Sequence, residues 1–284
     1  MNIESVAVIG SGTMGRGIAQ SAALSGKRVI LYDLTDDLLH RAAVAIAEDI
    51  AEGVRRGKTE PEKAESANRH MRLTTDLAQA AQVDLVIEAV PEDLDLKRKV
   101  FRQLDAEAPP QTILASNTSS LSISVIAAAT QRPGRVIGLH YFNPAHRMKL
   151  VEIIRGDLTH EDTVTACQKF VESLGKIPVL CGDTPAFIVN RIARPFYGEA
   201  LRLLGERVAD IETIDRLIAS LGFRMGPFEL LDLIGLDVNL AVTKSVYEAC
   251  FHDPKYRPHP IQQRMVDSGR LGRKSGHGFY DYSG

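Results

Sequence analysis

The sequence predicts an α/β protein: a doubly wound Rossmann-type sheet followed by a second, all-helical C-terminal domain. Apolar runs and helical segments alternate from residue 6 to residue 180, which is typical of a mostly parallel sheet covered by helices. A glycine-rich turn joins the first apolar run to the first helical segment. From Asp183 onward the segments read as helices, and no convincing strand occurs before the extreme C-terminus.

The first quarter of the chain predicts a βαβ unit and a helical excursion. We expect a strand over residues 6–9, a helix over 14–24 and a second strand over 28–32, which together form a unit of about 30 residues. A long helix follows over residues 36–56. The charged segment that continues to residue 70 predicts a helical excursion that lies outside the core.

The alternation resumes after this excursion and then gives way to helices. The expected strands cover residues 84–88, 112–116, 135–140, 150–154 and 177–180, with helices over 93–106 and 161–174. The later helices are expected over 186–204, 210–221, 226–233 and 237–250. The pattern changes at Asp183-Thr184-Pro185, so we expect a dinucleotide-binding domain over 1–184 and a helical substrate and dimerisation domain over 185–284.

Composition and charge predict an ordinary globular enzyme. The chain has 284 residues, is 44% hydrophobic and 25% charged, and has a formal net charge of -2. This balance argues against a nucleic-acid partner, because such proteins usually carry a basic stripe. The cysteines Cys167, Cys181 and Cys250 are odd in number and far apart, which is typical of reduced thiols, and no metal site is expected.

The N-terminal sequence and the hydropathy pattern predict a cytoplasmic location. The first residues lack the basic and apolar regions of a secretory signal. No run of 18 apolar residues could form a transmembrane helix, so we expect no membrane partner.

The glycine-rich turn over residues 10–15 (GSGTMG) predicts a dinucleotide site. Gly10 allows the turn, Gly12 lets the backbone approach a pyrophosphate at the helix N-terminus, and Gly15 permits close packing of the helix on the strand. Asp33 ends the second strand, where a carboxylate accepts hydrogen bonds from a ribose 2′-hydroxyl and repels a 2′-phosphate. The sequence therefore predicts NAD rather than NADP.

Two residues suit the oxidation of an alcohol. A base must take the hydroxyl proton, and histidine has an unperturbed pKa near 6.5. His140 is the last residue of a predicted strand, and Glu152 is an acid inside an apolar run, so Glu152 could orient the imidazole. The residues alone leave the alternatives open: His140 could be a hydrogen-bonded residue at a strand end, and Glu152 a solvent-facing carboxylate on an edge strand.

Several segments in one order resemble the L-3-hydroxyacyl-CoA dehydrogenase family. The resemblance runs from residue 6 to residue 282 and is carried by residues 115–120 (ASNTSS), 138–144 (GLHYFNP), 148–152 (MKLVE), 183–191 (DTPAFIVNR), 226–230 (GPFEL), 272–276 (GRKSG) and 278–280 (GFY). It implies NAD-dependent oxidation of the 3-hydroxyl of a short-chain acyl-CoA, or the reverse reduction, by a 3-hydroxybutyryl-CoA dehydrogenase-like enzyme of fatty acid metabolism. It also implies a homodimer.

The resemblance implies a role for each site residue. His140 is the base and Glu152 its orienting carboxylate, while Ser119 and Asn190 hold the substrate oxygens. The residues implied near the NAD ribose and nicotinamide are Glu92, Lys97, Asn143 and Lys274, together with Ser119; the two lysines could equally be solvated surface. Asn190 could instead be a helix cap or an interdomain contact.

The charged excursion is the candidate for the CoA phosphates, which need arginine or lysine. Arg55, Arg56 and Lys58 lie there, and the resemblance places this segment over the family's CoA site. The alternative is a solvated helix face, which is the usual fate of a charge run.

Two stretches depart from the family pattern. Tyr141 stands where phenylalanine is commoner, and residues 145–147 (AHR) replace an apolar stretch that usually contains proline. His146 is therefore a second candidate base, although the motif favours His140. The functional alternatives are a dehydrogenase of a non-CoA hydroxy acid such as a sugar acid, and a non-catalytic NAD-binding protein.

Overall fold

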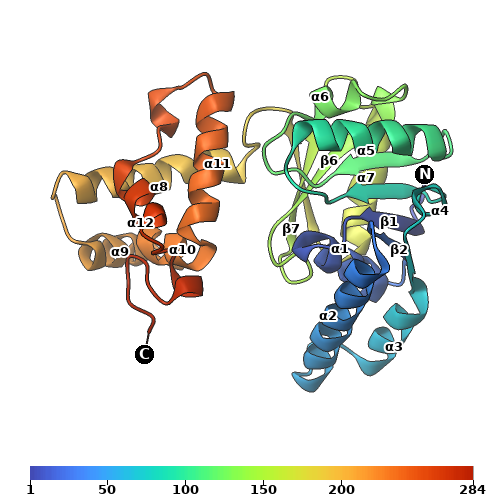
Figure 1. The fold of residues 1–284 in the computed structure, drawn as a ribbon, viewed down its shortest axis with the longest axis horizontal. Coiled ribbons are helices and arrows are strands. Elements are labelled where there is room, and N and C mark those ends of the chain that lie inside the picture. Colours follow the sequence, from blue (N-terminus) through green and yellow to red (C-terminus); the bar gives the residue numbers. More distant parts are fainter. Residues whose placement is uncertain (284) are drawn as a thin grey trace. The chain divides into compact units, whose positions relative to one another are not determined.

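The computed structural model describes residues 1–283, which divide into two compact units, Met1–Thr184 and the chain from Pro185 onward. The first unit is a sheet with helices on its faces, and the second is built from helices (Figure 1). The fold is therefore the predicted Rossmann-type α/β sheet with a helical C-terminal domain. Within the described residues, no helix combines the length and the apolar character that crossing a membrane would require.

An eight-stranded sheet forms the centre of the first unit. Its spatial order is β3-β2-β1-β4-β5-β6-β7-β8, and every neighbouring pair is parallel except β6 with β7. The chain order reverses between β1 and β4, the switch point where doubly wound sheets bind ligands. The strands are β1 Ser5–Ile9, β2 Arg28–Tyr32, β3 Met71–Thr74, β4 Leu85–Glu88, β5 Ile113–Ser116, β6 Val136–Tyr141, β7 Leu150–Arg155 and β8 Ile177–Gly182.

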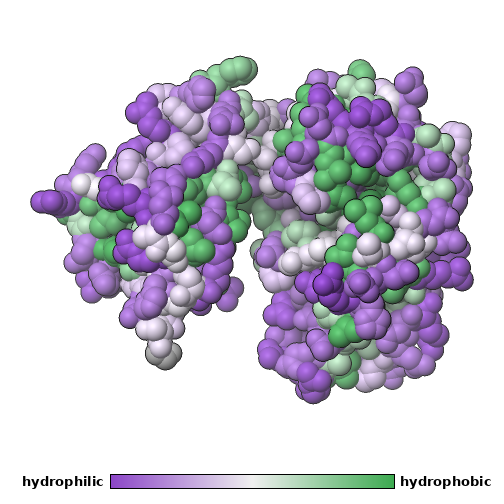
Figure 2. Space-filling model, in the orientation of Figure 1, coloured by the Kyte–Doolittle hydropathy of each residue, from purple (hydrophilic) through white to green (hydrophobic). Residues whose placement is uncertain are grey.

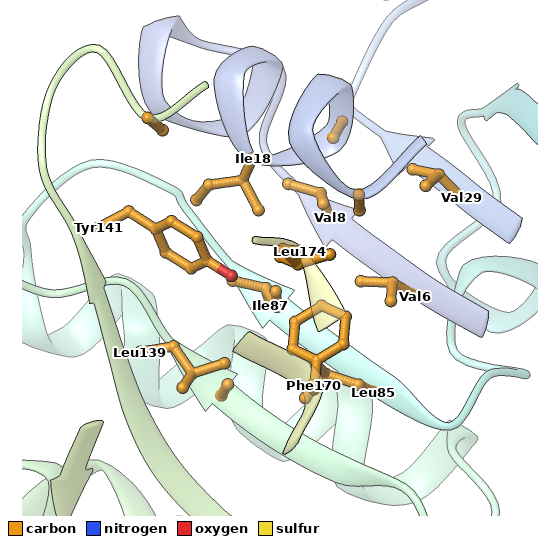
Figure 3. Close-up of a cluster of buried hydrophobic side chains, with 14 of the residues drawn as sticks. Val6, Val8, Ile18, Val29, Leu85, Ile87, Leu139, Tyr141, Phe170 and Leu174 are labelled. Carbon is orange, nitrogen blue, oxygen red and sulfur yellow. The ribbon is translucent and has the colours of Figure 1, made fainter. Parts of the chain in front are cut away.

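The helices of the first unit cover this sheet. Apolar side chains from β1, β4, β6 and the neighbouring helices pack into one core, part of which is drawn in Figure 3 with Ile18 and Phe170. Thr35 and Asp93 accept backbone N–H groups at the starts of two of these helices, which explains where they begin. The helices are α1 Thr13–Leu24, α2 Asp36–Arg55, α3 Pro61–His70, α4 Leu77–Ala80, α5 Leu94–Glu107, α6 Ile123–Ala127 and α7 Glu161–Ser173.

The predicted excursion is helical, but the expectation that it lies outside the core is wrong. Ala67 of α3 is fully buried and belongs to the core of the first unit, with Ala64 packed against it. The other faces of α2 and α3 are hydrophilic, as the surface around them shows (Figure 2). The sequence pattern did not indicate that α3 packs on the core, because the segment is mostly polar and charged and only two small alanines lie on its buried face.

Three short elements of the first unit were not predicted. Strand β3 pairs with β2 at the sheet edge, and its two central residues, Arg72 and Leu73, are exposed, so it lacks the apolar run of a buried strand. Helices α4 and α6 have only 4 and 5 residues, too short to show a helical period.

The second unit consists of helices around its own apolar core, which includes Phe228 and Leu231. Its first helix begins at Val189 rather than at the predicted residue 186, because Ala186 and Phe187 have left-handed backbone φ angles of 66° and 53°. The C-terminal segment forms only isolated bridges, and a helix over 260–267 was not predicted. The helices are α8 Val189–Gly205, α9 Ile211–Ser220, α10 Pro227–Ile234, α11 Leu236–Ala249 and α12 Pro260–Asp267.

Candidate active site

The glycine-rich turn between β1 and α1 packs closely on the neighbouring backbone and leaves open space at the helix N-terminus. Gly10 has a φ of 101°, and a Cβ there would lie 2.8 Å from the carbonyl oxygen of Ala89. A Cβ on Gly15 would lie 1.8 Å from the carbonyl oxygen of Gly10, so only glycine lets α1 approach the turn. At Gly12 a Cβ would meet nothing within 4 Å. That open space lies at the N-terminus of α1, where backbone N–H groups favour an anion.

A cavity of about 1010 Å³ opens beside this turn. The end of β2, the loop after β4 and one side of α5 also line it. Asp33 lies in its wall, where one carboxylate oxygen accepts from the backbone N–H of Ser11 at 2.7 Å and from its hydroxyl at 2.6 Å, while the other accepts from the Leu34 N–H at 2.7 Å. These bonds fix the carboxylate at the cavity edge. A cavity of this volume beside an open helix N-terminus, with an oriented carboxylate in its wall, fits a dinucleotide.

The antiparallel pairing of β6 and β7 brings His140 and Glu152 together. The two residues lie directly opposite each other in the ladder, where side chains on one face are neighbours. The His140 Nδ1 atom is 2.7 Å from a Glu152 carboxylate oxygen. His140 is 5% exposed and Glu152 1% exposed, so Glu152 is not a solvent-facing edge residue. The ring of Phe142 packs on the imidazole at a centroid distance of 4.4 Å.

A second buried carboxylate, which the sequence analysis missed, organises the neighbouring strand ends. Glu88 ends β4 and accepts from the ammonium of Lys97 and the backbone N–H of Val90, both at 2.7 Å. Its other oxygen accepts from the hydroxyl of Ser116 at 2.7 Å. Lys97 is 1% exposed, so the alternative of a solvated lysine is wrong. The signal was available: Glu88 is an acid that directly follows three apolar residues, much as Glu152 is an acid among apolar residues.

Glu92 continues this network into the loop after β5. One of its oxygens accepts from the Thr118 hydroxyl at 2.7 Å and from the Ser119 backbone N–H at 2.9 Å, and the same oxygen is 3.2 Å from the Ser119 hydroxyl. Lys97 lies 3.4 Å from its other oxygen. Burial opposes ionisation, but Lys97 and these hydrogen bonds outweigh it and lower the pKa of Glu92. An ionised Glu92 therefore holds the loop that carries Ser119.

The loop between β6 and β7 carries Asn143 and is held at three points. A Cβ on Gly17 would lie 3.0 Å from the Cβ of Ala145, so α1 touches the loop closely. Lys176 is 7% exposed, and its ammonium donates to two backbone carbonyls of the loop, each at 2.7 Å. The third point is Asp49 on α2, which pairs with the imidazole of His146 at 2.9 Å and with the adjacent arginine at 3.1 Å. The structure thus ties His146 to α2.

The candidate CoA residues lie at the exposed end of α2. Arg55 and Arg56 both pair with Glu52, and their side chains are 68% and 61% exposed. Lys58 is exposed in the turn that follows. An arginine paired with one exposed carboxylate can still exchange it for a phosphate, since surface ion pairs are weak.

The remaining two predicted site residues lie in the second unit. Asn190 is in the first turn of α8, and its backbone carbonyl accepts from Arg194 at 3.2 Å. Lys274 lies in a short 3₁₀ turn, where its ammonium is 2.6 Å from Asp237 at the start of α11.

Comparison with known proteins identifies the family over almost the whole chain. Residues 5–184 match the NAD binding domain of 3-hydroxyacyl-CoA dehydrogenase, and residues 187–282 match its C-terminal domain. The chain is 49% identical to 3-hydroxyadipyl-CoA dehydrogenase of Escherichia coli over 99% of its own length, but it spans 60% of that protein. It is 41% identical to a probable 3-hydroxybutyryl-CoA dehydrogenase of Bacillus subtilis, with 99% and 98% of the two chains covered.

A solved structure agrees with this assignment. That of (S)-3-hydroxybutyryl-CoA dehydrogenase from Ralstonia eutropha superposes with a TM-score of 0.94 at 40% identity and covers all of both chains. The predicted family, fold class and NAD cofactor are confirmed. Together with the cavity beside the glycine turn and the paired histidine and carboxylate, these matches show that the chain belongs to the 3-hydroxyacyl-CoA dehydrogenases, NAD-dependent oxidoreductases of the two-domain type.

Proposed function

We propose that this protein interconverts a short-chain L-3-hydroxyacyl-CoA and the 3-ketoacyl-CoA, with His140 exchanging the hydroxyl proton. The observation that carries the proposal is the buried pair of His140 and Glu152, joined at 2.7 Å across β6 and β7. A dehydrogenase needs a group that takes a proton as the alcohol is oxidised and returns it in the reverse reaction.

Under this proposal, the two imidazole nitrogens have different tasks. Nδ1 carries its proton toward Glu152, so Nε2 is the atom that takes the hydroxyl proton during oxidation. Glu152 stabilises the imidazolium that results, because the pair lies where water does not screen it. When bound, NAD supplies the acceptor for the hydride that leaves C3. In the reduction, Nε2 returns the proton to the ketone oxygen.

Ser119 and Asn190 are the proposed hydrogen-bond partners of the substrate oxygens. Ser119 is supported by Glu92, which holds its backbone N–H and thereby fixes the loop. The NAD site is proposed to include Gly10, Gly12, Gly15, Asp33, Glu92, Lys97, Asn143 and Lys274 as well as Ser119. Lys97 contributes through Glu88 and Glu92, since its ammonium is already bound to them.

The CoA phosphates are proposed to bind at Arg55, Arg56 and Lys58. These cations are exposed and close in sequence, which suits a phosphate that arrives from solvent. Arg56→Ala should raise KM for acetoacetyl-CoA more than KM for the matching pantetheine thioester, which lacks the nucleotide phosphates. Equal changes for the two substrates would assign these residues to solvated surface.

The proposed substrate class is tested by comparing thioesters with free acids. Reduction of 3-ketoacyl-CoAs of increasing length with NADH should give the highest kcat/KM at short chains. A matched set of sugar acids with NAD should give no turnover. Oxidation of a free hydroxy acid without activity on any thioester would contradict the proposal and favour the non-CoA alternative.

We also propose a cytoplasmic homodimer. Apolar side chains lie exposed on the second unit, including Leu217, Leu221 and Leu233, and Figure 2 shows apolar surface around α9 and α10. Sedimentation at micromolar concentration should give twice the 31.1 kDa chain mass. A monomer throughout the concentration range would contradict the dimer.

A further inference from the structure

The second unit contains a buried cation that has no acidic partner. Among the described residues, the buried basic side chains are Lys27, Lys97, Lys176 and Arg194. The first two pair with glutamates, at 3.2 Å and 2.7 Å. Lys176 has no carboxylate partner among the salt bridges of the described residues either, but its ammonium has a structural task, because it donates to two backbone carbonyls of the loop between β6 and β7. Arg194, at 5% exposure, is the case that needs another explanation.

The contacts of Arg194 are all with neutral groups. Its Nε donates to the carbonyl of Asn190 at 3.2 Å, and one terminal nitrogen, Nη1, donates to the Asn239 carbonyl at 3.0 Å and to the Thr243 hydroxyl at 2.9 Å. Its guanidinium carbon lies 5.1 Å from the centre of the Tyr197 ring. Within residues 1–283, no carboxylate lies within 4.0 Å of it. Burial lowers the pKa of Arg194 to about 10, which leaves it cationic at neutral pH.

One nitrogen of Arg194 is left for a ligand. Nη2 has no hydrogen-bond partner in the part of the chain that the structure describes. The side-chain atoms that are sealed from solvent without a partner are Tyr141 Oη, Asp237 Oδ1 and Asn239 Nδ2, and Nη2 is not among them. It therefore reaches the surface of the second unit. A nearly buried guanidinium with one accessible N–H edge is a strong site for a carboxylate.

The position of Arg194 relates this site to the substrate. Asn190 and Arg194 are four residues apart on α8, so they lie on one face of the helix about one turn, or 5.4 Å, apart. Asn190 is the proposed partner of a substrate oxygen. A chain of only a few carbon atoms beyond the reacting carbon covers the distance of one turn.

We propose that Arg194 is a specificity-determining residue that binds a carboxylate at the far end of the acyl chain. The substrate class is then a 3-hydroxyacyl-CoA whose acyl group ends in a second carboxyl group. This rests on the proposed function, in which Asn190 faces the reacting carbon. Burying a cation without a counter-charge is costly, and the substrate carboxylate supplies that counter-charge. A methyl-terminated chain leaves the guanidinium uncompensated, so the site discriminates against it.

A purely structural role makes a different prediction. Arg194 could serve only to fasten α8 to α11 through Asn239 and Thr243. In that case the protein would process acyl chains of equal length without regard to a terminal charge. Substrate preference, rather than stability, therefore separates the two roles.

The test compares two six-carbon 3-ketoacyl-CoAs, one ending in a carboxylate and one in a methyl group. In the wild type, kcat/KM with NADH should favour the carboxylate by about tenfold or more, which corresponds to about 1.4 kcal/mol. Arg194→Gln should abolish this preference, and Arg194→Lys should keep part of it. Arg202→Gln is the matched control: Arg202 is on the same helix but already pairs with Glu199 at 2.7 Å, so the wild-type preference should remain.

The outcomes separate this proposal from the proposed function. A wild type that treats both thioesters equally, or prefers the methyl-terminated one, would overturn the role of Arg194 even if every variant misfolded. Retention of the preference in Arg194→Gln would also overturn it. Failure to reduce either thioester would instead contradict the proposed function.

Discussion

Two buried carboxylates in the same sheet each pair with a nitrogen-bearing side chain, and only one of the two pairs suits proton transfer. Glu152 pairs with His140, whose imidazole is the side chain most often used as a general acid or base, and the two residues lie opposite each other on adjacent antiparallel strands. Glu88 pairs with the ammonium of Lys97, and it also accepts from Val90 and Ser116. Burial and distance are nearly the same in the two groups. The difference teaches that the side chain paired with the carboxylate decides whether a buried pair can transfer a proton or only stabilise the structure.

The largest expected effect is on the rate of the reaction and tests the pair of His140 and Glu152. His140→Gln should lower kcat by about 10²–10⁴, because a single general base typically contributes that much. NADH should still bind with nearly unchanged affinity, as measured by fluorescence titration, since His140 is not in the wall of the dinucleotide cavity. The same change at His146 should leave kcat close to that of the wild type. A His140→Gln variant within threefold of the wild type would remove His140 from the mechanism.

Removing one partner of the Glu88–Lys97 pair should instead lower the free energy of unfolding. Glu88→Gln leaves the Lys97 ammonium buried beside a neutral amide, and removal of one partner of a buried pair typically costs about 3–5 kcal/mol. Urea denaturation should therefore show a lower midpoint. The matched control is Glu65→Gln, which removes an exposed pair with Arg69 and should change the free energy of unfolding by less than about 1 kcal/mol. Equal midpoints for Glu88→Gln and the wild type would show that Lys97 finds another partner.

The orienting carboxylate should have a smaller effect on rate than the base itself. Glu152→Gln keeps the shape of the side chain but cannot stabilise the imidazolium, so kcat should fall by about tenfold or more. Circular dichroism and a thermal melt should show a folded protein. Unchanged kcat in this variant would place Glu152 with Glu88, as a carboxylate that only supports the fold.

The smallest effect concerns the residue next to His140 on β6. Tyr141 is 1% exposed, and its hydroxyl has no hydrogen-bond partner within the described residues (Figure 3). Burial raises the pKa of this hydroxyl well above its usual range. Folding removes this hydroxyl from water without giving it a hydrogen bond, which is unfavourable. Tyr141→Phe removes the hydroxyl and should therefore stabilise the protein by about 1 kcal/mol. Thermal melts should move up by a few degrees while kcat stays the same. A lower melting temperature would show that the hydroxyl has a partner, such as a buried water.

Local signals in the sequence determined much of the fold. The glycine turn, the apolar runs of β1, β4 and β5, and the helix start at Asp93 follow from backbone sterics and side-chain periodicity, which act over a few residues. The sequence did not predict strand β3, because it is a half-exposed edge strand. It predicted helix α3 but not its burial, because the helix buries only small alanines. Their places depend on what packs against them rather than on their own composition.

The tertiary structure decided how the site residues pair. The sequence could name His140 and Glu152, but only the antiparallel register of β6 and β7 places them opposite each other, because a shift of one residue would turn Glu152 to the other face. It could name Lys97, but only the fold shows that its ammonium lies between Glu88, at the end of β4, and Glu92, in the loop that follows. Charges far apart in the chain have no local signature of their partners. The sequence therefore determined which chemical groups are present, and the fold decided which of them meet.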